Sequence, residues 1–271
     1  MFELLLIAIA LIGSFAAGLY DLKTTNIPDT LCIFMIIAGL AIHSFYAFTT
    51  GDFSTLINSL LFGGLFLAFG LLMYFTGQWG GGDGELLVAI GILLPNLTIV
   101  KTFFPFAISF FINSFFIGAI YSIAYSLVLS YKNPAVSKNF FYSIKDPFYL
   151  ASLAILLLFS ITSFFYFKIL SIVFFLIFIL VLFWKYAKSI ELGFYKRIPV
   201  SKLRVDDMLG EDIPRLRMHK NLIKGLTKTQ VQKIKKIKRY VIIKEGIRYG
   251  LVFPLALLFT LLFGDIFLLL F

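Results

Sequence analysis

Two aspartates of this chain stand at the borders of long apolar runs. Asp21 closes the first run, and Asp83 opens the fourth, directly after three glycines. A carboxylate at a membrane edge is costly unless it is hydrated, paired or protonated. Two carboxylates brought together hold one shared proton, so the ionised one can activate a water while the protonated one polarises a carbonyl. Asp21 and Asp83 are therefore our candidate pair for hydrolysis of a peptide bond, and we expect neither a metal nor a cofactor.

The elements that must position this pair are membrane helices. Hydrophobic residues make up 60% of the 271 residues, and the mean hydropathy is +0.97. A soluble domain of this length could not hide so much apolar surface, whereas runs of about 20 apolar residues match the bilayer core. We therefore predict an all-α polytopic bundle of about six to eight transmembrane helices. The apolar runs cover residues 2–20, 30–48, 53–76, 84–100, 103–131, 148–167, 169–186 and 251–271. The stretch 148–186 is open to interpretation as one span or two.

The distribution of lysines predicts the orientation. The loop after the first run carries Lys23, the loop after the third carries no Lys/Arg, and the loop after the fifth carries Lys132, Lys138 and Lys145. The seventh run is followed by a large basic segment, whereas the alternate loops carry only Lys101 and Lys168. Positive loops stay in the cytoplasm, so the first set is expected to be cytoplasmic and both termini outside. Asp21 and Asp83 then meet the membrane at the same, cytoplasmic face. We expect a membrane core with both aspartates at 1–131, further helices at 132–187, a basic cytoplasmic domain at 188–249 and a last helix at 250–271.

The basic domain accounts for the net positive charge of the chain. Residues 188–248 contain 17 Lys/Arg and 6 Asp/Glu, which is +11, against +10 for the whole chain. Thr227 and Gln230 have the spacing of a helical capping box before an amphipathic helix, and Lys233, Lys235, Lys236, Lys238 and Arg239 would lie on its outer face. We expect this face to meet anionic lipid headgroups, with a protein partner as the alternative. The segment carries no nucleic-acid recognition motif, so we expect no nucleic-acid partner.

The glycines around Asp83 have two interpretations. Gly80, Gly82 and Gly84 lack the side chains that keep another backbone away, so they could admit an extended substrate or let the Asp83 loop move. Alternatively, they form a flexible turn, with Asp83 as the N-cap of the next helix. We take these glycines and Lys23 as supporting residues of the candidate site.

At these residues the chain resembles the type IV prepilin peptidase family of membrane aspartic proteases. Gly80-Gly81-Gly82-Asp83 matches the GxGD motif, and Asp21 with Lys23 and Ile27-Pro28 is similar to the first-aspartate segment. The presenilin and signal-peptide-peptidase branch shares GxGD, but its Pro-Ala-Leu motif is absent here. The resemblance over residues 1–131 implies that Asp21 and Asp83 are the catalytic aspartates.

A looser resemblance, over about 190–271, points to the archaeal branch that cleaves preflagellins (archaellins) and prepilins. Lys244-Glu245-Gly246-Ile247 and Gly264-Asp265 are similar to its C-terminal extension, but Arg248-Tyr249 stands where the pattern has a proline. The implied activity is removal of a short basic leader from precursor archaellins or pilin-like proteins at the cytoplasmic face of the cell membrane. Bacterial relatives add a cysteine-rich segment and N-methylate the product. This chain has one cysteine, so we expect no methyltransferase activity.

Two alternatives stay open. The chain could be another GxGD peptidase, or a transporter or scaffold whose two aspartates bind cations. A proton relay usually places ionisable groups in mid-span, whereas Asp21 and Asp83 stand at the ends of their runs.

Overall fold

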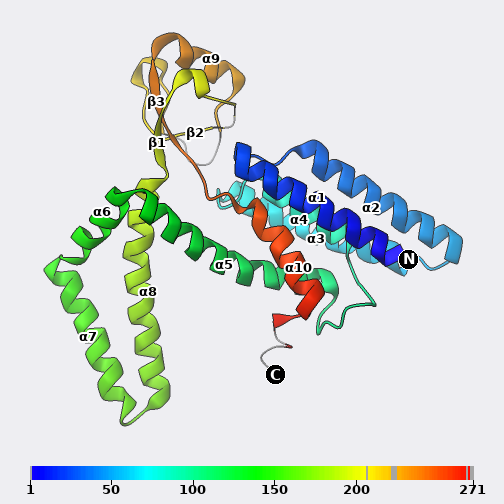
Figure 1. Ribbon diagram of the computed structural model, residues 1–271, viewed down its shortest axis with the longest axis horizontal. Helices are drawn as coiled ribbons and strands as arrows, with labels where there is room; N and C mark the ends of the chain where they lie inside the picture. Colours follow the sequence, from blue (N-terminus) through cyan, green and yellow to red (C-terminus); the bar gives the residue numbers. More distant parts are fainter. Residues whose placement is uncertain (1, 206, 221–224, 267, 269–271) are drawn as a thin grey trace. The chain divides into compact units, whose positions relative to one another are not determined.

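The computed structural model describes residues 2–205, 207–220, 225–266 and 268, and within them the chain is mainly helical (Figure 1). The helices are α1 (Phe2–Thr24), α2 (Asp29–Thr50), α3 (Ser54–Phe75), α4 (Gly81–Leu93), α5 (Phe106–Lys132), α6 (Pro134–Ile144), α7 (Pro147–Phe164), α8 (Lys168–Gly193), α9 (Lys228–Ile237) and α10 (Val252–Phe263). The strands are β1 (Tyr195–Pro199), β2 (Met208–Leu209) and β3 (Tyr240–Lys244), and 3₁₀ turns lie at η1 (Val200–Lys202), η2 (Pro214–Leu216) and η3 (Tyr249–Leu251).

Six of the described helices are long and apolar enough to cross a membrane, namely α1, α2, α3, α5, α7 and α8. Their number and length confirm the predicted polytopic helical class, and the chain is a multi-pass membrane protein. The stretch 148–186 forms two helices, because the chain leaves the helix after Phe164 and resumes it at Lys168.

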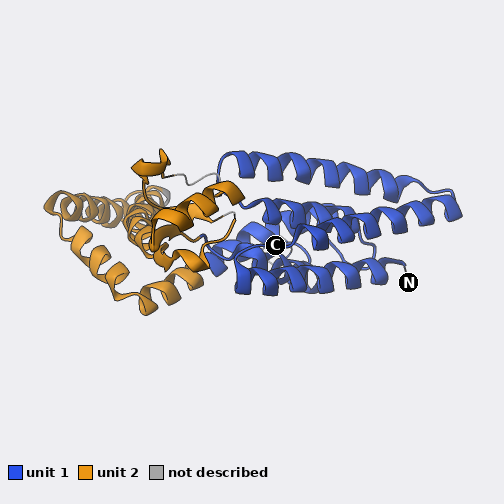
Figure 2. Ribbon diagram, turned by 90° about the horizontal axis from the view of Figure 1, so that it is seen from above, with its two compact units in different colours: residues 1–122, 221–225, 246–271 blue, residues 123–220, 226–245 orange. Residues whose placement is uncertain are grey.

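The chain divides into two compact units, which Figure 2 colours separately. Unit 1 takes the described residues of 1–122, 221–225 and 246–271, and unit 2 takes those of 123–220 and 226–245. Unit 1 therefore contains α1 to α4, most of α5, η3 and α10, and both candidate aspartates.

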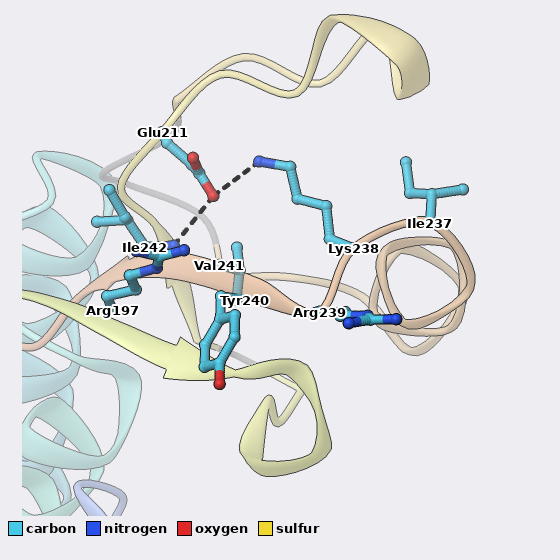
Figure 3. Close-up of a pocket in the computed structure, with 8 residues that line it drawn as sticks. All are labelled: Arg197, Glu211, Ile237, Lys238, Arg239, Tyr240, Val241 and Ile242. Carbon is cyan, nitrogen blue, oxygen red and sulfur yellow. Dashed lines mark hydrogen bonds and ion pairs between the residues drawn. The ribbon is translucent and has the colours of Figure 1, made fainter.

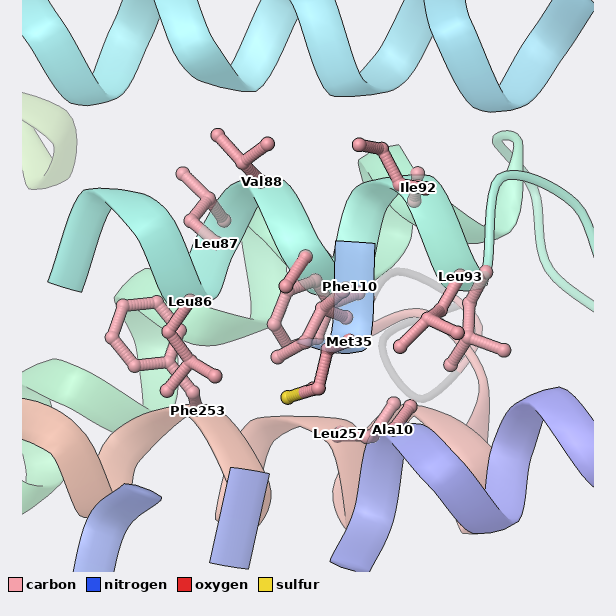
Figure 4. Packing of buried hydrophobic residues seen from close by; sticks show 14 of the residues in the cluster. Ala10, Met35, Leu86, Leu87, Val88, Ile92, Leu93, Phe110, Phe253 and Leu257 are labelled. Carbon is pink, nitrogen blue, oxygen red and sulfur yellow. The ribbon is translucent and has the colours of Figure 1, made fainter. Parts of the chain in front are cut away.

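Helix α4 is the buried centre of unit 1. Its side chains from Leu86 to Leu93 are buried on all sides (Figure 4), as expected for a helix that is apolar all round. The expected span 84–100 was wrong in length, since α4 has 13 residues and ends at Leu93. The reason is Pro95, because a proline disfavours the helical conformation of the residue before it.

The last helix is also shorter than its apolar run. Helix α10 ends at Phe263, where Gly264 adopts a positive φ of 70°, a conformation open to glycine. The predicted run continued to Phe271, and residues 267 and 269–271 of it lie outside the described residues.

Unit 2 combines helices with a small sheet. Its strands are antiparallel in the order β1-β3-β2. The capping box of α9 is confirmed, since Thr227 and Gln230 bond each other's backbone N–H groups. Val231 and Ile234 of α9 are buried in one cluster with Val241 and Ile243 of β3. Lys233, Lys235 and Lys236 are exposed, whereas α9 ends at Ile237, so the predicted helical face does not extend to Lys238 and Arg239. The sheet itself was not predicted.

Candidate active site

The first aspartate lies in the last turns of α1. Asp21 is 7% exposed. The helix ends because Thr25 takes a positive φ of 59°, and its N–H donates to the Asp21 carbonyl at 2.7 Å. The turn brings Ile27 back into the core of unit 1. Cys32, the one cysteine of the chain, is buried in the same core.

The second aspartate lies in the first turn of α4. Asp83 is not the N-cap residue; it is the third residue of the helix, and its Oδ2 accepts the N–H of Gly80 at 3.3 Å. A carboxylate in the first turn of a helix is favoured by the helix dipole. The remaining residues of α4 are packed inside the unit, so the position of Asp83 is set by a buried helix and not by a surface loop.

Two glycines fit α4 against its neighbours. A Cβ added at Gly82 would lie 2.7 Å from the Cβ of Ile27, and one added at Gly84 would lie 3.2 Å from the Cα of Gly70 in α3. The first separation is shorter than real Cβ contacts and the second is tighter than most of them, so a side chain at either position would force its neighbour to move. The chain therefore brings the segment after Asp21 directly against the segment before Asp83.

The opposite ends of α1 and α4 are also joined by hydrogen bonds. Glu3, at the start of α1, accepts hydrogen bonds from the N–H and hydroxyl of Thr98 at 3.0 and 2.8 Å. Because Thr98 follows α4, helices α1 and α4 run antiparallel, and Asp21 and Asp83 share one end of the unit.

The two carboxylates interact. Asp83 is half-buried, and its helix lies outside the six candidate spans. Burial raises the pKa of its carboxyl to about 7. The charge of Asp21 raises this pKa further, whereas the hydrogen bond from the Gly80 N–H lowers it. A raised pKa keeps a carboxyl protonated near neutral pH. The pair can therefore hold one proton between two acids, which is the state that aspartic hydrolysis needs.

The predicted supporting residues fall into different surroundings. Gly80 is exposed before α4, whereas the space beside Gly82 and Gly84 is filled by Ile27 and Gly70. Lys23 is exposed on the last turn of α1. Substrate access through these glycines stays a prediction, and at Gly82 and Gly84 their space serves packing in this structure.

A third segment, the one that leads into α10, also meets the pair, and the sequence did not predict this. The N–H of Gly250 donates to Asp21 Oδ2 at 2.9 Å, and Arg248 donates to the carbonyl of Leu22 at 2.5 Å. Tyr249 packs between Trp79 and Phe253. The departure at Arg248-Tyr249 marked the position, but no local pattern links it to Asp21 across 229 residues.

Asp265 belongs to a separate cluster. Its Oδ2 accepts the backbone N–H groups of Phe103 and Phe104, and Asn113 bonds Gly264 and Ile266 on either side of it. This arrangement closes the loop after α4. Among the described residues, no three His, Cys, Asp or Glu side chains gather as metal ligands.

Comparison with known proteins shows what this chain is similar to. Residues 7–123 match the model of the type IV leader peptidase family. The chain is 36% identical over 91 residues to a preflagellin peptidase of Methanococcus voltae, which covers 33% of this chain and 38% of that protein. It is 30% identical over 150 residues to a preflagellin peptidase of Methanococcus maripaludis, covering 49% and 63%.

A third relative carries a different name. The chain is 31% identical over 114 residues to a prepilin peptidase of Methanothermobacter thermautotrophicus, covering 40% of this chain and 30% of that protein. The chain thus spans less than two thirds of the length of these relatives. The matched family segment contains the whole of α1 after Leu6, α2, α3 and α4, and with them both aspartates. Residues 7–123 of this chain are therefore similar to the type IV leader peptidase family, and both aspartates lie within the matched segment.

Proposed function

We propose that the protein is a membrane aspartic endopeptidase that removes the short basic leader of preflagellin or prepilin-like precursors. One observation carries the proposal: Asp21 and Asp83 share one end of unit 1 and interact there, within the segment that matches the leader peptidase family. The names of the relatives, preflagellin peptidase and prepilin peptidase, supply the substrate class.

The charges near the pair support a basic leader as substrate. Asp29 and Glu85 interact with each other, and the charges of both act on Cys32 together with the charge of Asp83, so they lie at the same end of unit 1. Glu85 also has a buried carboxylate oxygen with no hydrogen-bond partner among the described residues. The Asp21–Asp83 pair holds one proton, and the remaining negative charge at this end would attract a cationic leader and leave the apolar part of the precursor to the lipid.

The cytoplasmic face is part of the proposal. Lysine-rich loops stay on the cytoplasmic side, and Lys23 lies in the last turn of α1, close in sequence to Asp21. The precursor would then be cut on the cytoplasmic side, at a peptide bond just before its apolar segment.

We also propose that unit 2 binds anionic lipid headgroups. A groove of about 480 Å³ there is lined by Arg197, Glu211, Ile237, Lys238, Arg239, Tyr240, Val241 and Ile242 (Figure 3). Glu211 pairs with Lys238 at 2.9 Å, which leaves two arginines as the surplus charge. Arginine binds phosphate oxygens through two N–H groups at once. In nanodiscs, anionic lipid should slow tryptic cleavage of unit 2 relative to neutral lipid, and R197A/R239A should remove that protection.

The test of the peptidase is cleavage of a tagged precursor by the full chain in membranes. Wild type should shorten preflagellin or prepilin, whereas Asp21→Asn and Asp83→Asn should not, although both insert normally. Mass spectrometry of the product should show a free, unmethylated amino terminus.

The matched control is Asp52→Asn. Asp52 is exposed, and its Oδ1 accepts the N–H of Ser54 at the start of α3. Asparagine serves equally well in this role, so this variant should cleave like wild type. Full cleavage by Asp83→Asn would exclude the two-aspartate mechanism, and a wild type that leaves every precursor intact would favour cation binding by the pair.

A further inference from the structure

The two aspartates have different surroundings. Asp21 Oδ2 accepts a hydrogen bond of 2.9 Å from the N–H of Gly250, and the positive charge of Arg248 acts on the same carboxylate. Asp83 accepts one longer bond, 3.3 Å from Gly80, and faces the negative charge of Asp21. Both carboxyl groups are at least partly buried, and each faces the charge of the other, so burial and repulsion favour the neutral form of either one. The Gly250 N–H and the Arg248 charge favour the ionised form of Asp21, and these two contacts distinguish it from Asp83.

The segment of Arg248 is held firmly against α1. Arg248 donates to the carbonyl of Leu22, the neighbour of Asp21, at 2.5 Å, and Tyr121 donates to the Arg248 carbonyl at 2.8 Å. A Cβ at Gly250 would lie 2.9 Å from the Cβ of Asp21, and one at Gly18, a turn earlier in α1, would lie 2.9 Å from Leu251. The two glycines let the backbones approach until an N–H reaches the carboxylate.

The other titratable groups on the elements around Asp21 do not offset this asymmetry. On α4 they are Asp83 and Glu85, on α2 Asp29 and Cys32, and at η3 Tyr249. The carboxylates among them add negative charge, Tyr249 interacts with Asp83, and Lys23 on α1 itself is exposed. Arg248 is thus the cation that acts on Asp21 from this shell.

We propose that Arg248 and Gly250 are positioning residues that hold Asp21 as the ionised base of the pair and leave the proton on Asp83. The assignment rests on the proposed peptidase function. Water would give one proton to Asp21 as its oxygen bonds to the scissile carbonyl carbon, while Asp83 gives its proton to the carbonyl oxygen. When the C–N bond breaks, Asp21 passes its proton to the leaving nitrogen, and Asp83 takes one back from a hydroxyl of the diol. Both aspartates then regain their first state.

Variants of Arg248 test the charge. In precursor cleavage by the full chain, Arg248→Gln should move the acidic limb of the pH–rate profile up by about one pH unit, because a nearby cation shifts a carboxylate by this order. Arg248→Lys keeps the charge and should keep the limb close to the wild-type position. A merely structural role of Arg248 would lower the rate of both variants and leave the limb unmoved, and that result would overturn the proposal.

Variants of glycine test the hydrogen bond. Gly250→Ala must displace Asp21 and should lower the cleavage rate about 100-fold, the cost of a misplacement near 1 Å. The matched control is Gly246→Ala in the same segment, where no atom lies within 4 Å of an added Cβ, and it should cleave like wild type. Equal rates for the two variants would show that Gly250 does not position Asp21.

Labelling with a hydrophobic carbodiimide reads the charge state without cleavage, since this reagent modifies protonated carboxyl groups. At pH 6, mass spectrometry should find the adduct on Asp83 in wild type and on both aspartates in Arg248→Gln. Equal labelling of Asp21 and Asp83 in wild type would reject the inference even if precursors are cleaved. The expected labelling in a chain that cleaves no precursor would reject the proposed function and keep the charge assignment.

Discussion

Ile27 occupies the space in which Gly82 would carry a side chain. The Cβ of Ile27 lies 2.7 Å from the position of a Gly82 Cβ, and the carbonyl oxygen of Ile27 lies 3.3 Å from it. Ile27 follows Asp21 by six residues, and Gly82 directly precedes Asp83. This contact therefore joins the segment that follows Asp21 to the segment that precedes Asp83.

Enlarging Gly82 should separate the pair. Gly82→Ala forces Ile27 or the start of α4 to move, and we expect the cleavage rate to fall about 100-fold while the helical content is unchanged. Gly81→Ala is the control, because its nearest neighbour would be Tyr74 at 3.9 Å. Initial rates on a precursor check both. Similar rates would mean that Ile27 does not set the geometry of the site.

Gly70 and Gly64 should differ in their effect on stability. A Cβ at Gly70 would lie 3.0 Å from the Cα of Gly84, whereas one at Gly64, also in α3, meets no atom within 4 Å. We expect Gly70→Ala to lower the free energy of unfolding by about 1–3 kcal/mol, as overpacking does. Gly64→Ala should be neutral or slightly stabilising, since alanine favours helices. Thermal unfolding in detergent, followed by intrinsic fluorescence, measures both, and a stable Gly70→Ala would contradict the close helix crossing.

The cleavage rate should depend on the proton of Asp83. Because the pKa of Asp83 is raised to about 7, its carboxyl is protonated below that pH and loses the proton above it. The active pair needs one protonated carboxyl, so kcat/KM should fall as the pH rises through about 7. Initial rates from pH 5 to 9 test this, and Asp52→Asn should give the same profile as wild type. A rate that stays constant to pH 9 would contradict a proton on Asp83.

Asp265 should matter for folding and not for chemistry. Asp265→Ala leaves the N–H groups of Phe103 and Phe104 without their acceptor, which costs about 1–3 kcal/mol for a buried group. Asp265→Asn keeps an acceptor oxygen and should lose less. Thermal unfolding separates the two. At a temperature where it is folded, Asp265→Ala should still cleave, and complete loss of cleavage there would give Asp265 a part in the reaction.

The meeting of Asp21 and Asp83 could be expected from the sequence because the chain between them crosses the bundle twice, as α2 and α3, and returns to the same end. Other features depend on contacts that no local pattern signals. Gly250 reaches Asp21 from 229 residues away. The β-branched run from Val241 to Ile243 is typical of a strand, but no local pattern signals its pairing with β1 and β2. The length of α4 was readable in part, since Pro95 marks its end.

The burial of Cys32 has a practical consequence. This thiol has no exposed surface and shares the core with Ile27, close to the contact that joins the two aspartate segments. A maleimide can reach it only when that part of the bundle opens, so the rate of alkylation measures how often this local opening occurs. A ligand that binds both aspartates should reduce this opening and slow the alkylation of Cys32. The alkylation rate would therefore report whether a ligand is bound at the site.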